Sequence, residues 1–219
     1  MQKRSFKLHE IIEKREITDS TFILRMEKND LDFVAGQHIQ VGPSNGIHTR
    51  EYSIYSCPKD DYIEILVRET EGGLVTPALK KLKVDDAVVI NDAVGFFTIE
   101  KEVARDVPFL FIATGTGISP FHSFVKQYAG INYKLIHGIR LAEESYERED
   151  YENGRYISCT SQDGKGDFQG YVTDYLKANP VNLDTLCYLC GNCDMIYDAF
   201  DILEKQGVKS ENIFTEVYF

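Results

Sequence analysis

The sequence predicts two domains in a chain of 219 residues, an all-β half followed by an α/β half. Short alternating segments rich in Ile, Val and Tyr fill the first hundred residues, whereas apolar segments alternate with helix-like segments in the rest. The composition shifts between these patterns at VGFFTIEKEVARDVP, residues 94–108. We therefore expect one domain over residues 1–100 and a second over residues 106–219.

In the first half, six segments alternate apolar and polar residues and are separated by clusters of Asp, Gly, Asn and Pro. Several short strands at this spacing predict a barrel or a sandwich. TPALKKL, with Pro77 at a first-turn position, predicts one short helix over 77–82. The six expected strands are SFKLHEII (5–12), TFILRME (21–27), QHIQV (37–41), REYSIYS (50–56), YIEILVRE (62–69) and AVVIN (87–91).

In the second half, apolar segments alternate with helical or acidic ones, which predicts βαβ units and a parallel sheet. The expected strands are FLFIA (109–113), YKLIHGI (133–139), YISCT (156–160) and TLCYLC (185–190). The expected helices are SPFHSFVKQY (119–128), VTDYLKA (172–178) and DMIYDAFDILEKQ (194–206).

Charge and composition exclude some classes of function. The net charge of -11 repels nucleic acid and anionic membranes, so neither is an expected partner. The charged start and strand-sized apolar runs predict neither a signal peptide nor a membrane span, which favours a cytoplasmic location. Cys187, Cys190 and Cys193 have C-x-x-C-x-x-C spacing without a fourth ligand nearby, so no metal is expected.

The stretch IATGTGISPF, residues 112–121, joins an expected strand to an expected helix. Gly115 and Gly117 would allow backbone N–H groups to approach a phosphate, with Ser119 as the helix N-cap. Pro120 stands where the dinucleotide motif G-x-G-x-x-G has its third Gly. The alternative is an ordinary tight turn between a strand and a helix.

Two further stretches have both a structural and a functional interpretation. In CGNCDMIYDAF, Asn192 is expected to cap the following helix. Cys190 is either a buried small apolar residue or a thiol facing a ligand at the end of a parallel strand. The aromatic pair Tyr218–Phe219 either lies against a flat ligand or belongs to a docked strand.

Five motifs in this order resemble those of the ferredoxin–NADP reductase family, particularly its small bacterial ferredoxin/flavodoxin reductases. They are R-x-Y-S (50–53), G-G-x-x-T (72–76), G-T-G-I-S-P (115–120), C-G-x-x-x-M (190–195) and E-x-Y-aromatic (216–219). The resemblance implies an N-terminal antiparallel β-barrel that binds FAD and a C-terminal Rossmann-like parallel sheet that binds NAD(P)H. It further implies hydride transfer between NAD(P)H and bound FAD, and electron exchange with ferredoxin or flavodoxin.

The resemblance also implies roles for individual residues around FAD. Arg50 would pair with the FAD pyrophosphate, Tyr52 would lie on one face of the flavin ring, and Ser53 would approach the flavin N5. Tyr218 would cover the opposite face and Phe219 would stack on the adenine. A second pyrophosphate contact would come from Gly72, Gly73 and Thr76.

On the nicotinamide side, Cys190 and Glu216 would act with Ser53 as the catalytic residues. The pyrophosphate of the nucleotide would bind the turn formed by Thr114, Gly115, Thr116 and Gly117. The remaining expected nucleotide contacts are Gly191, Met195, Arg140, Ser161 and Gln162.

The choice of nucleotide and of acceptor stays open. NADPH-specific relatives carry a Ser-Arg pair where this chain has Ser161–Gln162, and Tyr171 stands in place of another family arginine. NADH or dual use is therefore favoured. Arg140 either contacts the nucleotide, as the resemblance implies, or forms an ion pair with Glu143 or Glu144. Basic docking patches for an acidic partner could form from Lys80, Lys81 and Lys83, or from Lys3, Arg4 and Lys7.

Two other functions compete with this one. A flavin or ferric reductase would use flavin as a diffusing substrate, whereas the aromatic pair at 218–219 favours retained FAD. An electron-transfer subunit of a larger complex would carry a cysteine-rich iron–sulfur extension, which does not follow Phe219.

Overall fold

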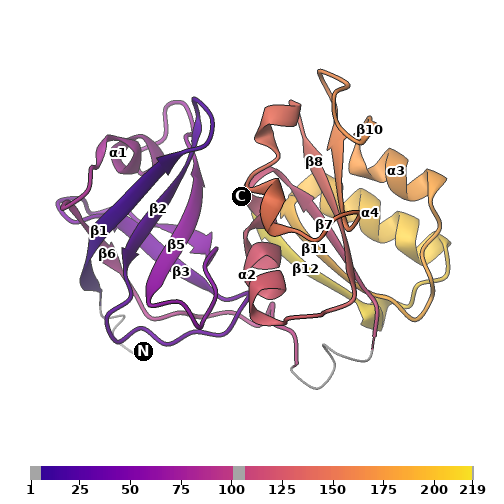
Figure 1. Cartoon of the computed structure of the whole chain (residues 1–219), viewed down its shortest axis with the longest axis horizontal. Coiled ribbons are helices and arrows are strands. Elements are labelled where there is room, and N and C mark those ends of the chain that lie inside the picture. Colours follow the sequence, from indigo (N-terminus) through magenta and orange to yellow (C-terminus); the bar gives the residue numbers. More distant parts are fainter. Residues whose placement is uncertain (1–5, 101–106, 219) are drawn as a thin grey trace. The chain divides into compact units, whose positions relative to one another are not determined.

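The computed structural model describes residues 6–100 and 107–218 (Figure 1). Two compact units divide the chain, one formed by Met1–Thr98 with Ser119–Gln127 and the other by Ile99–Ile118 with Tyr128–Phe219. Each unit has its own sheet and its own hydrophobic core.

The first unit is an antiparallel sheet of six strands with the order β4-β3-β6-β1-β2-β5. The sheet is nearly closed, because the Tyr55 N–H donates to the Glu64 carbonyl at 2.8 Å and the Glu64 N–H donates to Ser56 Oγ at 3.0 Å. These bonds connect the segment after β4 to β5, so the predicted antiparallel barrel is confirmed. The elements are β1 (Lys7–Glu16), β2 (Thr21–Glu27), β3 (His38–Pro43), β4 (Arg50–Ser53), β5 (Tyr62–Arg68), α1 (Thr76–Lys81) and β6 (Ala87–Ile90).

The alternation of apolar and polar residues explains the barrel, because the apolar side chains on one face of each strand pack into a single core. Fully buried members of this core include Ile11, Phe22, Leu24 and Ile39. The first strand is longer than predicted, because its charged end pairs with β2, where Glu13 lies opposite Arg25. Conversely, β4 stops at Ser53 because the chain then turns toward β5.

Helix α2 (Ser119–Gln127) belongs to the barrel unit although it follows the Gly-rich turn in sequence. Its His122 ring stacks on Tyr55, with ring centroids 3.7 Å apart and an interplanar angle of 3°. Ser123 Oγ donates to the Ser56 carbonyl at 2.7 Å. The 3-10 turn η2 (Gly115–Ile118) runs directly into this helix, so Ser119 is a helical residue and the expected N-cap there is wrong.

The second unit is a parallel sheet, as predicted, and its strand order is β10-β9-β8-β7-β11-β12 (Figure 1). The two-residue strand β10 was not expected, because a segment this short has no periodicity to detect. The elements are β7 (Phe109–Thr114), β8 (Tyr133–Ile139), η3 (Ala142–Glu144), η4 (Arg148–Asp150), β9 (Tyr156–Thr160), β10 (Phe168–Gln169), α3 (Val172–Ala178), β11 (Leu186–Asn192), α4 (Cys193–Lys205), η5 (Ser210–Asn212) and β12 (Ile213–Tyr218).

The strand order creates a switch point between β7 and β11. From β7 the chain proceeds outward through β8 and β9, and it then returns to place β11 and β12 on the other side of β7. Ligands of open parallel sheets bind outside the carboxyl ends of the strands at such a point. Among the described residues, no helix is both long and apolar enough to cross a membrane.

Candidate functional site

The Gly-rich turn lies at this switch point, where β7 ends at Thr114 and η2 begins. A Cβ on Gly117 would lie 2.5 Å from the carbonyl oxygen of Cys190, and one on Gly191 would lie 2.3 Å from Thr114 Oγ1. Gly115 and Gly191 also have positive φ angles of 52° and 130°, which disfavour residues with side chains. The sequence therefore needs glycine here, because the end of β7 and the turn after it pack so closely against the end of β11 that no Cβ fits.

Thr114 ties these strand ends together with its side chain. Its Oγ1 accepts the Asn192 N–H at 2.8 Å. Asn192 Oδ1 in turn accepts the Met195 N–H at 3.2 Å, which confirms the predicted cap of α4. The turn and the start of α4 thus form one hydrogen-bonded edge, with Thr116 inside the 3-10 turn.

Cys190 and Glu216 are brought together by the parallel pairing of β11 with β12. The Cys190 thiol donates to Glu216 Oε2 at 3.9 Å, and this cysteine is completely buried. Burial, and then the negative charge of Glu216, raise the pKa of Cys190 well above its usual value. The thiol is therefore neutral at physiological pH, as a hydrogen-bond donor requires. Tyr218 lies two residues beyond Glu216 on β12, and Phe219 lies outside the described residues.

His137 was missed by sequence reasoning, which treated it as part of an apolar strand. It is completely buried on β8, and its Nε2 lies 2.8 Å from the Gly115 carbonyl oxygen. Its Nδ1 lies 2.7 Å from the Tyr156 hydroxyl. Burial lowers the pKa of His137 to about 4, so the ring is neutral. A histidine inside an otherwise apolar parallel strand was the available signal, because buried polar groups require partners.

Arg140, Ser161 and Gln162 meet at the adjacent ends of β8 and β9. The Ser161 N–H donates to the Ile139 carbonyl and the Gln162 N–H to the Arg140 carbonyl, both at 3.0 Å. Arg140 Nη2 also donates to Glu144 Oε1 at 3.1 Å. The ion pair considered for Arg140 is thus present, while its guanidinium remains about half exposed.

Glu144 is nearly buried, and it accepts backbone N–H groups as well as the guanidinium. Burial opposes its ionisation, but hydrogen bonds from Arg140 and Leu141 outweigh that effect and lower its pKa. The carboxylate therefore fixes the start of the loop after β8. Tyr171, at the position of a family arginine, is 66% exposed.

In the barrel unit, the R-x-Y-S motif forms the whole of β4. Arg50 is exposed, and among the residues that the structure describes it forms no ion pair. Tyr52 packs against the barrel core, and its buried hydroxyl has no hydrogen-bond partner within the described chain. Ser53 is buried at the end of the strand. The motif thus offers an available cation and an unsatisfied hydroxyl side by side on one strand.

The G-G-x-x-T motif forms the loop that leads into α1. Gly72 has a φ of 73° with nothing within 4 Å of the position of a Cβ, and the Gly73 N–H donates to the Thr70 carbonyl at 2.9 Å. Thr76 Oγ1 accepts the Thr70 N–H at 2.9 Å. These bonds hold the loop closed while leaving open space over Gly72.

The three cysteines of the C-x-x-C-x-x-C stretch serve different parts of the second unit. Cys187 packs in the apolar core, Cys190 bonds to Glu216, and Cys193 is the first residue of α4. Burial raises the pKa of Cys187 to about 12, so this thiol is protonated.

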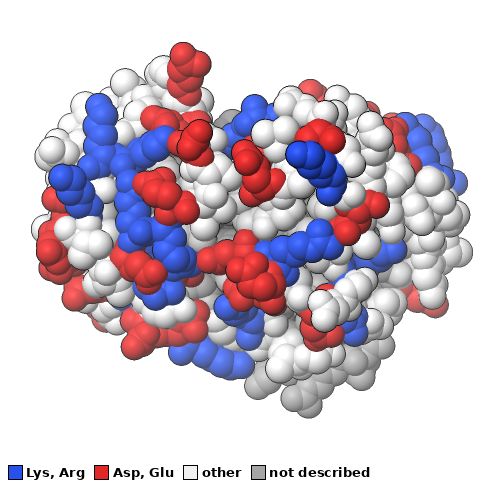
Figure 2. Space-filling model, turned by 45° about the horizontal axis from the view of Figure 1, so that its top comes forward, with Lys and Arg blue, Asp and Glu red and all other residues white. Residues whose placement is uncertain are grey.

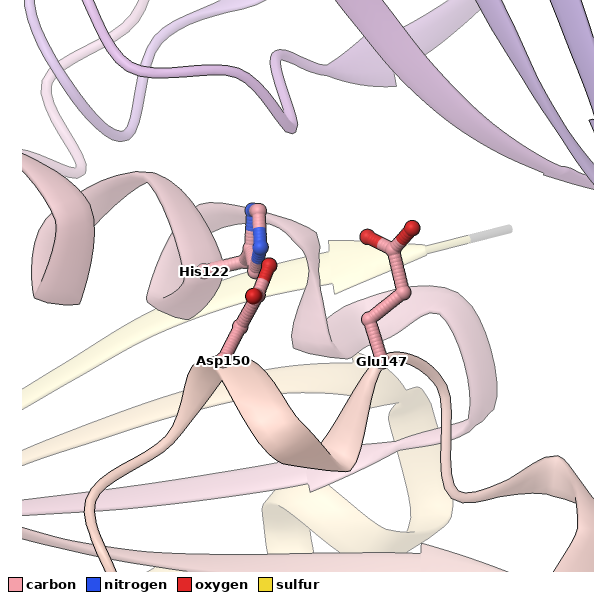
Figure 3. Close-up of side chains that lie close together, drawn as sticks. All are labelled: His122, Glu147 and Asp150. Atoms are coloured by element: carbon pink, nitrogen blue, oxygen red, sulfur yellow. The ribbon is translucent and has the colours of Figure 1, made fainter.

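Figure 3 shows the side chains of His122, Glu147 and Asp150. His122 is part of α2 in the barrel unit, where its Nδ1 lies 2.7 Å from the Tyr55 carbonyl oxygen. Glu147 and Asp150 bracket the turn η4 of the other unit, and the Asp150 N–H donates to the Glu147 carbonyl. The His122 side chain therefore bonds within the barrel unit, and the main chains of Glu147 and Asp150 form a turn within the other unit.

A cavity of about 230 Å³ lies in the second unit at the opposite end of its strands. It opens beside the first residues of β7 and β8, Phe109 and Tyr133, and beside Tyr175 of α3. The Gly-rich turn follows the last residue of β7, so this cavity is separate from the switch point.

Basic and acidic side chains are interspersed on the face shown in Figure 2. Of the lysines considered for a docking patch, Lys7 pairs with Asp30 at 2.8 Å and Lys80 pairs with Glu69 at 2.6 Å. Lys3 and Arg4 lie outside the described residues. The described basic candidates are thus partly neutralised by neighbouring carboxylates.

Two family models match the chain in sequence order. The oxidoreductase FAD-binding domain matches residues 8–99, and the oxidoreductase NAD-binding domain matches residues 111–201. The matched segments correspond to the barrel strands and to most of the parallel sheet.

Curated relatives resemble the chain at modest identity. The toluate 1,2-dioxygenase electron transfer component of Pseudomonas putida is 29% identical over 221 residues, which cover 93% of this chain and 65% of that protein. The flavodoxin/ferredoxin–NADP reductase of Escherichia coli is 28% identical over 207 residues, 83% of each chain. The chain spans less than two thirds of several relatives, including 64% of the phenol hydroxylase P5 protein of Acinetobacter pittii.

Solved structures share the fold. The ferredoxin NADP+ reductase from Neisseria gonorrhoeae, with bound FAD and NADP, has a TM-score of 0.86 at 21% identity and covers 99% of this chain and 100% of its own. The ferredoxin reductase in carbazole 1,9a-dioxygenase has a TM-score of 0.85 at 18% identity, covering 98% of this chain and 70% of its own.

Proposed function

Since this chain belongs to the ferredoxin–NADP reductase family, with an FAD-binding and an NAD-binding oxidoreductase domain, we propose that it is an NAD(P)H-dependent flavoenzyme. It would move hydride between NAD(P)H and bound FAD and exchange single electrons with a small redox protein. The observation that carries the proposal is the glycine-built turn at the β7–β11 switch point, in a chain whose other unit is the family's barrel.

The residues of the barrel unit fit FAD. The buried Tyr52 hydroxyl lacks a partner among the described residues, and a bound polar group would satisfy it. Arg50 presents an exposed guanidinium whose planar geometry suits a pyrophosphate. The open space over Gly72, with Gly73 and Thr76 behind it, would admit the same pyrophosphate. Tyr218 and Phe219 remain the proposed covering and stacking aromatics.

The residues of the second unit fit a nicotinamide nucleotide. Thr114, Gly115, Thr116 and Gly117 form the turn at the switch point, where backbone N–H groups at the start of the helical segment would receive a phosphate. Gly191 and Met195 lie at the adjoining edge of β11 and α4. We therefore assign the pyrophosphate to this turn.

For the catalytic step we propose Ser53, Cys190 and Glu216. Bound FAD would supply the chemistry that accepts hydride and releases electrons singly. Ser53 would offer a hydroxyl to the reacting edge of the flavin, while the neutral Cys190 thiol and Glu216 would position the nicotinamide. In this proposal each side chain would orient its own reactant and keep water away from it.

We propose NADH or dual nucleotide use. Gln162 is uncharged, so it does not neutralise a 2′-phosphate, and Arg140 is engaged by Glu144. Ser161 would bond to the ribose from the same strand end. The half-exposed guanidinium of Arg140 is the one cation among these proposed nucleotide contacts.

For the acceptor we propose a small electron carrier such as ferredoxin or flavodoxin. The E. coli relative is named as a reductase of both. A second candidate is service as the electron-transfer component of an oxygenase, which the similarity to the toluate dioxygenase component favours. Neither nucleic acid nor membrane is a proposed partner, and five free thiols support a cytoplasmic location.

Anaerobic stopped-flow reduction of the purified protein tests the proposal, with NADH and NADPH titrated separately and the flavin absorbance followed. We expect yellow protein that one nucleotide reduces rapidly. Colourless protein that reduces only added free flavin would overturn the bound-FAD proposal in favour of a flavin reductase. Reduced protein mixed with ferredoxin, flavodoxin or an oxygenase component would then separate the acceptors by rate.

A further inference from the structure

We propose that His137 is a positioning residue for nucleotide binding, which holds the Gly115 carbonyl so that the following peptide presents its N–H to the phosphate. The inference rests on the proposed function, because it takes the ligand of the turn to be a pyrophosphate. The inference assigns a role in this turn to a residue of the neighbouring strand β8, which lies outside the Gly-rich motif.

Two hydrogen bonds determine the state of the His137 ring. The Gly115 carbonyl oxygen only accepts, so Nε2, at 2.8 Å, carries the proton and donates. In a neutral ring Nδ1 is then the acceptor, and the Tyr156 hydroxyl, at 2.7 Å, donates to it. The ring is buried and neutral, so both contacts persist in one tautomer.

Tyr156 is itself held in place on β9. The Arg148 guanidinium lies 5.0 Å from the centre of its ring, and the Tyr151 ring lies 5.2 Å away. The chain of contacts therefore runs from η4 and β9 through His137 to the turn after β7. Residues of β9 and β8 thus fix the orientation of the Gly115 carbonyl in the turn that follows β7.

The orientation of that carbonyl determines the direction of the next N–H. In a planar trans peptide the C=O of Gly115 and the N–H of Thr116 point in opposite directions. His137 draws the carbonyl to one side, so the Thr116 N–H points to the other. Gly115 has a φ of 52°, and without a side chain its peptide could adopt other orientations at little cost. His137 supplies the restraint that glycine lacks.

The test uses the full-length FAD-containing protein with two substitutions that differ in reach. In His137→Gln the amide nitrogen occupies the place of Nε2 and can still donate to Gly115. In His137→Asn the shorter side chain places its donor near Nδ1 and leaves Gly115 without one. Calorimetry measures binding of ADP-ribose, which has the pyrophosphate, and of adenosine, which lacks it, while thermal unfolding and FAD content are followed in parallel.

We expect His137→Asn to raise the Kd of ADP-ribose about ten- to hundredfold. This is the usual range for losing a hydrogen bond to a charged group, here the bond from the Thr116 N–H to the phosphate. His137→Gln should stay within about threefold of the wild type, although both variants lower the melting temperature similarly. Adenosine binding should not change. In turnover, His137→Asn should raise KM for the nucleotide and leave kcat at saturation unchanged.

Equal ADP-ribose affinities of the two variants, whether both lowered or both unchanged, would overturn the inference. If both bind ADP-ribose and adenosine more weakly in proportion to their lost stability, His137 has a structural role alone. Wild-type protein that binds no NADH, NADPH or ADP-ribose would instead refute the proposed function, which separates the two failures.

Discussion

In the parallel-sheet unit the candidate nucleotide region is built from backbone, whereas in the barrel unit the candidate flavin region is built from side chains. Gly117 and Gly191 bring two strand ends within a distance at which no Cβ fits. In contrast, Arg50 and Tyr52 stand on a strand, and Gly72 has open space around it. The first region depends on close packing, and the second depends on chemical groups that packing leaves available.

The difference predicts how each region responds to substitution. A backbone-built region fails when volume is added, because the neighbouring atoms are themselves main chain. A region built from side chains loses a chemical function while its fold persists. The predictions below test this contrast, from the largest expected effect to the smallest.

The largest effect is expected from added volume at the switch point. Gly117→Ala places a Cβ 2.5 Å from the Cys190 carbonyl oxygen, and such overpacking should lower the free energy of unfolding by about 3 kcal/mol. Gly130→Ala is the matched control in the same unit, with a φ of 78° and open space. It should cost only the left-handed strain of about 1–2 kcal/mol. Urea unfolding measures both, and equal losses would contradict the steric argument.

The next largest effect is a dependence of the free energy of unfolding of the second unit on pH. The pKa of His137 falls to about 4 from 6.5 in the unfolded chain, so the unfolded state binds more protons between these values. Stability should therefore be complete above pH 6.5 and fall by about 3 kcal/mol as the pH drops to 4. The groups facing His137 are Tyr146, Tyr156 and Glu144, whose charge opposes the shift. His137→Gln should remove this dependence in urea unfolding.

Asp167 provides a control for that pH range. Burial raises its pKa, but hydrogen bonds from Arg148 and Ser158 outweigh this and lower it to about 2. Its contribution should be present above the ordinary value of 3.8 and be lost as the pH falls toward 2. Asp167→Asn should therefore leave the slope between pH 4 and 6.5 intact. If Asp167→Asn abolished the dependence of the free energy of unfolding on pH in this range, that dependence could not be assigned to His137.

In the barrel unit, Ser53→Ala should lose function while the fold persists. We expect flavin reduction by NADH to slow by about tenfold or more, since small errors of positioning are costly in a transfer step. FAD retention should change little, and equal losses of both would exclude Ser53 from the hydride step. Ser56→Ala is the control, because Ser56 Oγ accepts the Glu64 N–H. That variant should lower stability by about 1–3 kcal/mol without slowing reduction.

The smallest effect concerns nucleotide choice. Gln162→Arg should shift the ratio of kcat/KM toward NADPH by about tenfold, because a guanidinium pairs with a 2′-phosphate. Gln169→Arg on β10 adds the same charge on the next strand and should leave the ratio nearly unchanged. A similar shift in both variants would indicate a general charge effect and not a contact of residue 162.

Much of the fold could be predicted because its periodicity is strong. The segment TFILRME is β2, YKLIHGI is β8, and the antiparallel and parallel halves follow from their patterns. Local patterns did not reveal that the charged end of β1 pairs with β2, or that α2 completes the barrel unit. Both depend on partners distant in sequence, which alternation does not encode.

The candidate site was predicted unevenly for a similar reason. The Gly-rich turn and the Asn192 cap follow from motifs at strand ends, whereas Cys190 and Glu216 were placed together only through the family resemblance. His137 did not, because its contact with Gly115 depends on the pairing of β8 with β7, which places Ala113 opposite His137. A strand residue acquires such a role only when the order of strands is known.

The course of the chain through α2 limits how this molecule can be recombined with its relatives. A fragment that ends near residue 100 lacks the helix whose His122 stacks on Tyr55, and one that begins near residue 106 carries that helix without its partners. A chimaera that exchanges the nucleotide-binding half must therefore retain the α2 face that matches its own barrel. In this chain the segment that would have to be exchanged with a barrel is therefore interrupted and not a single continuous stretch.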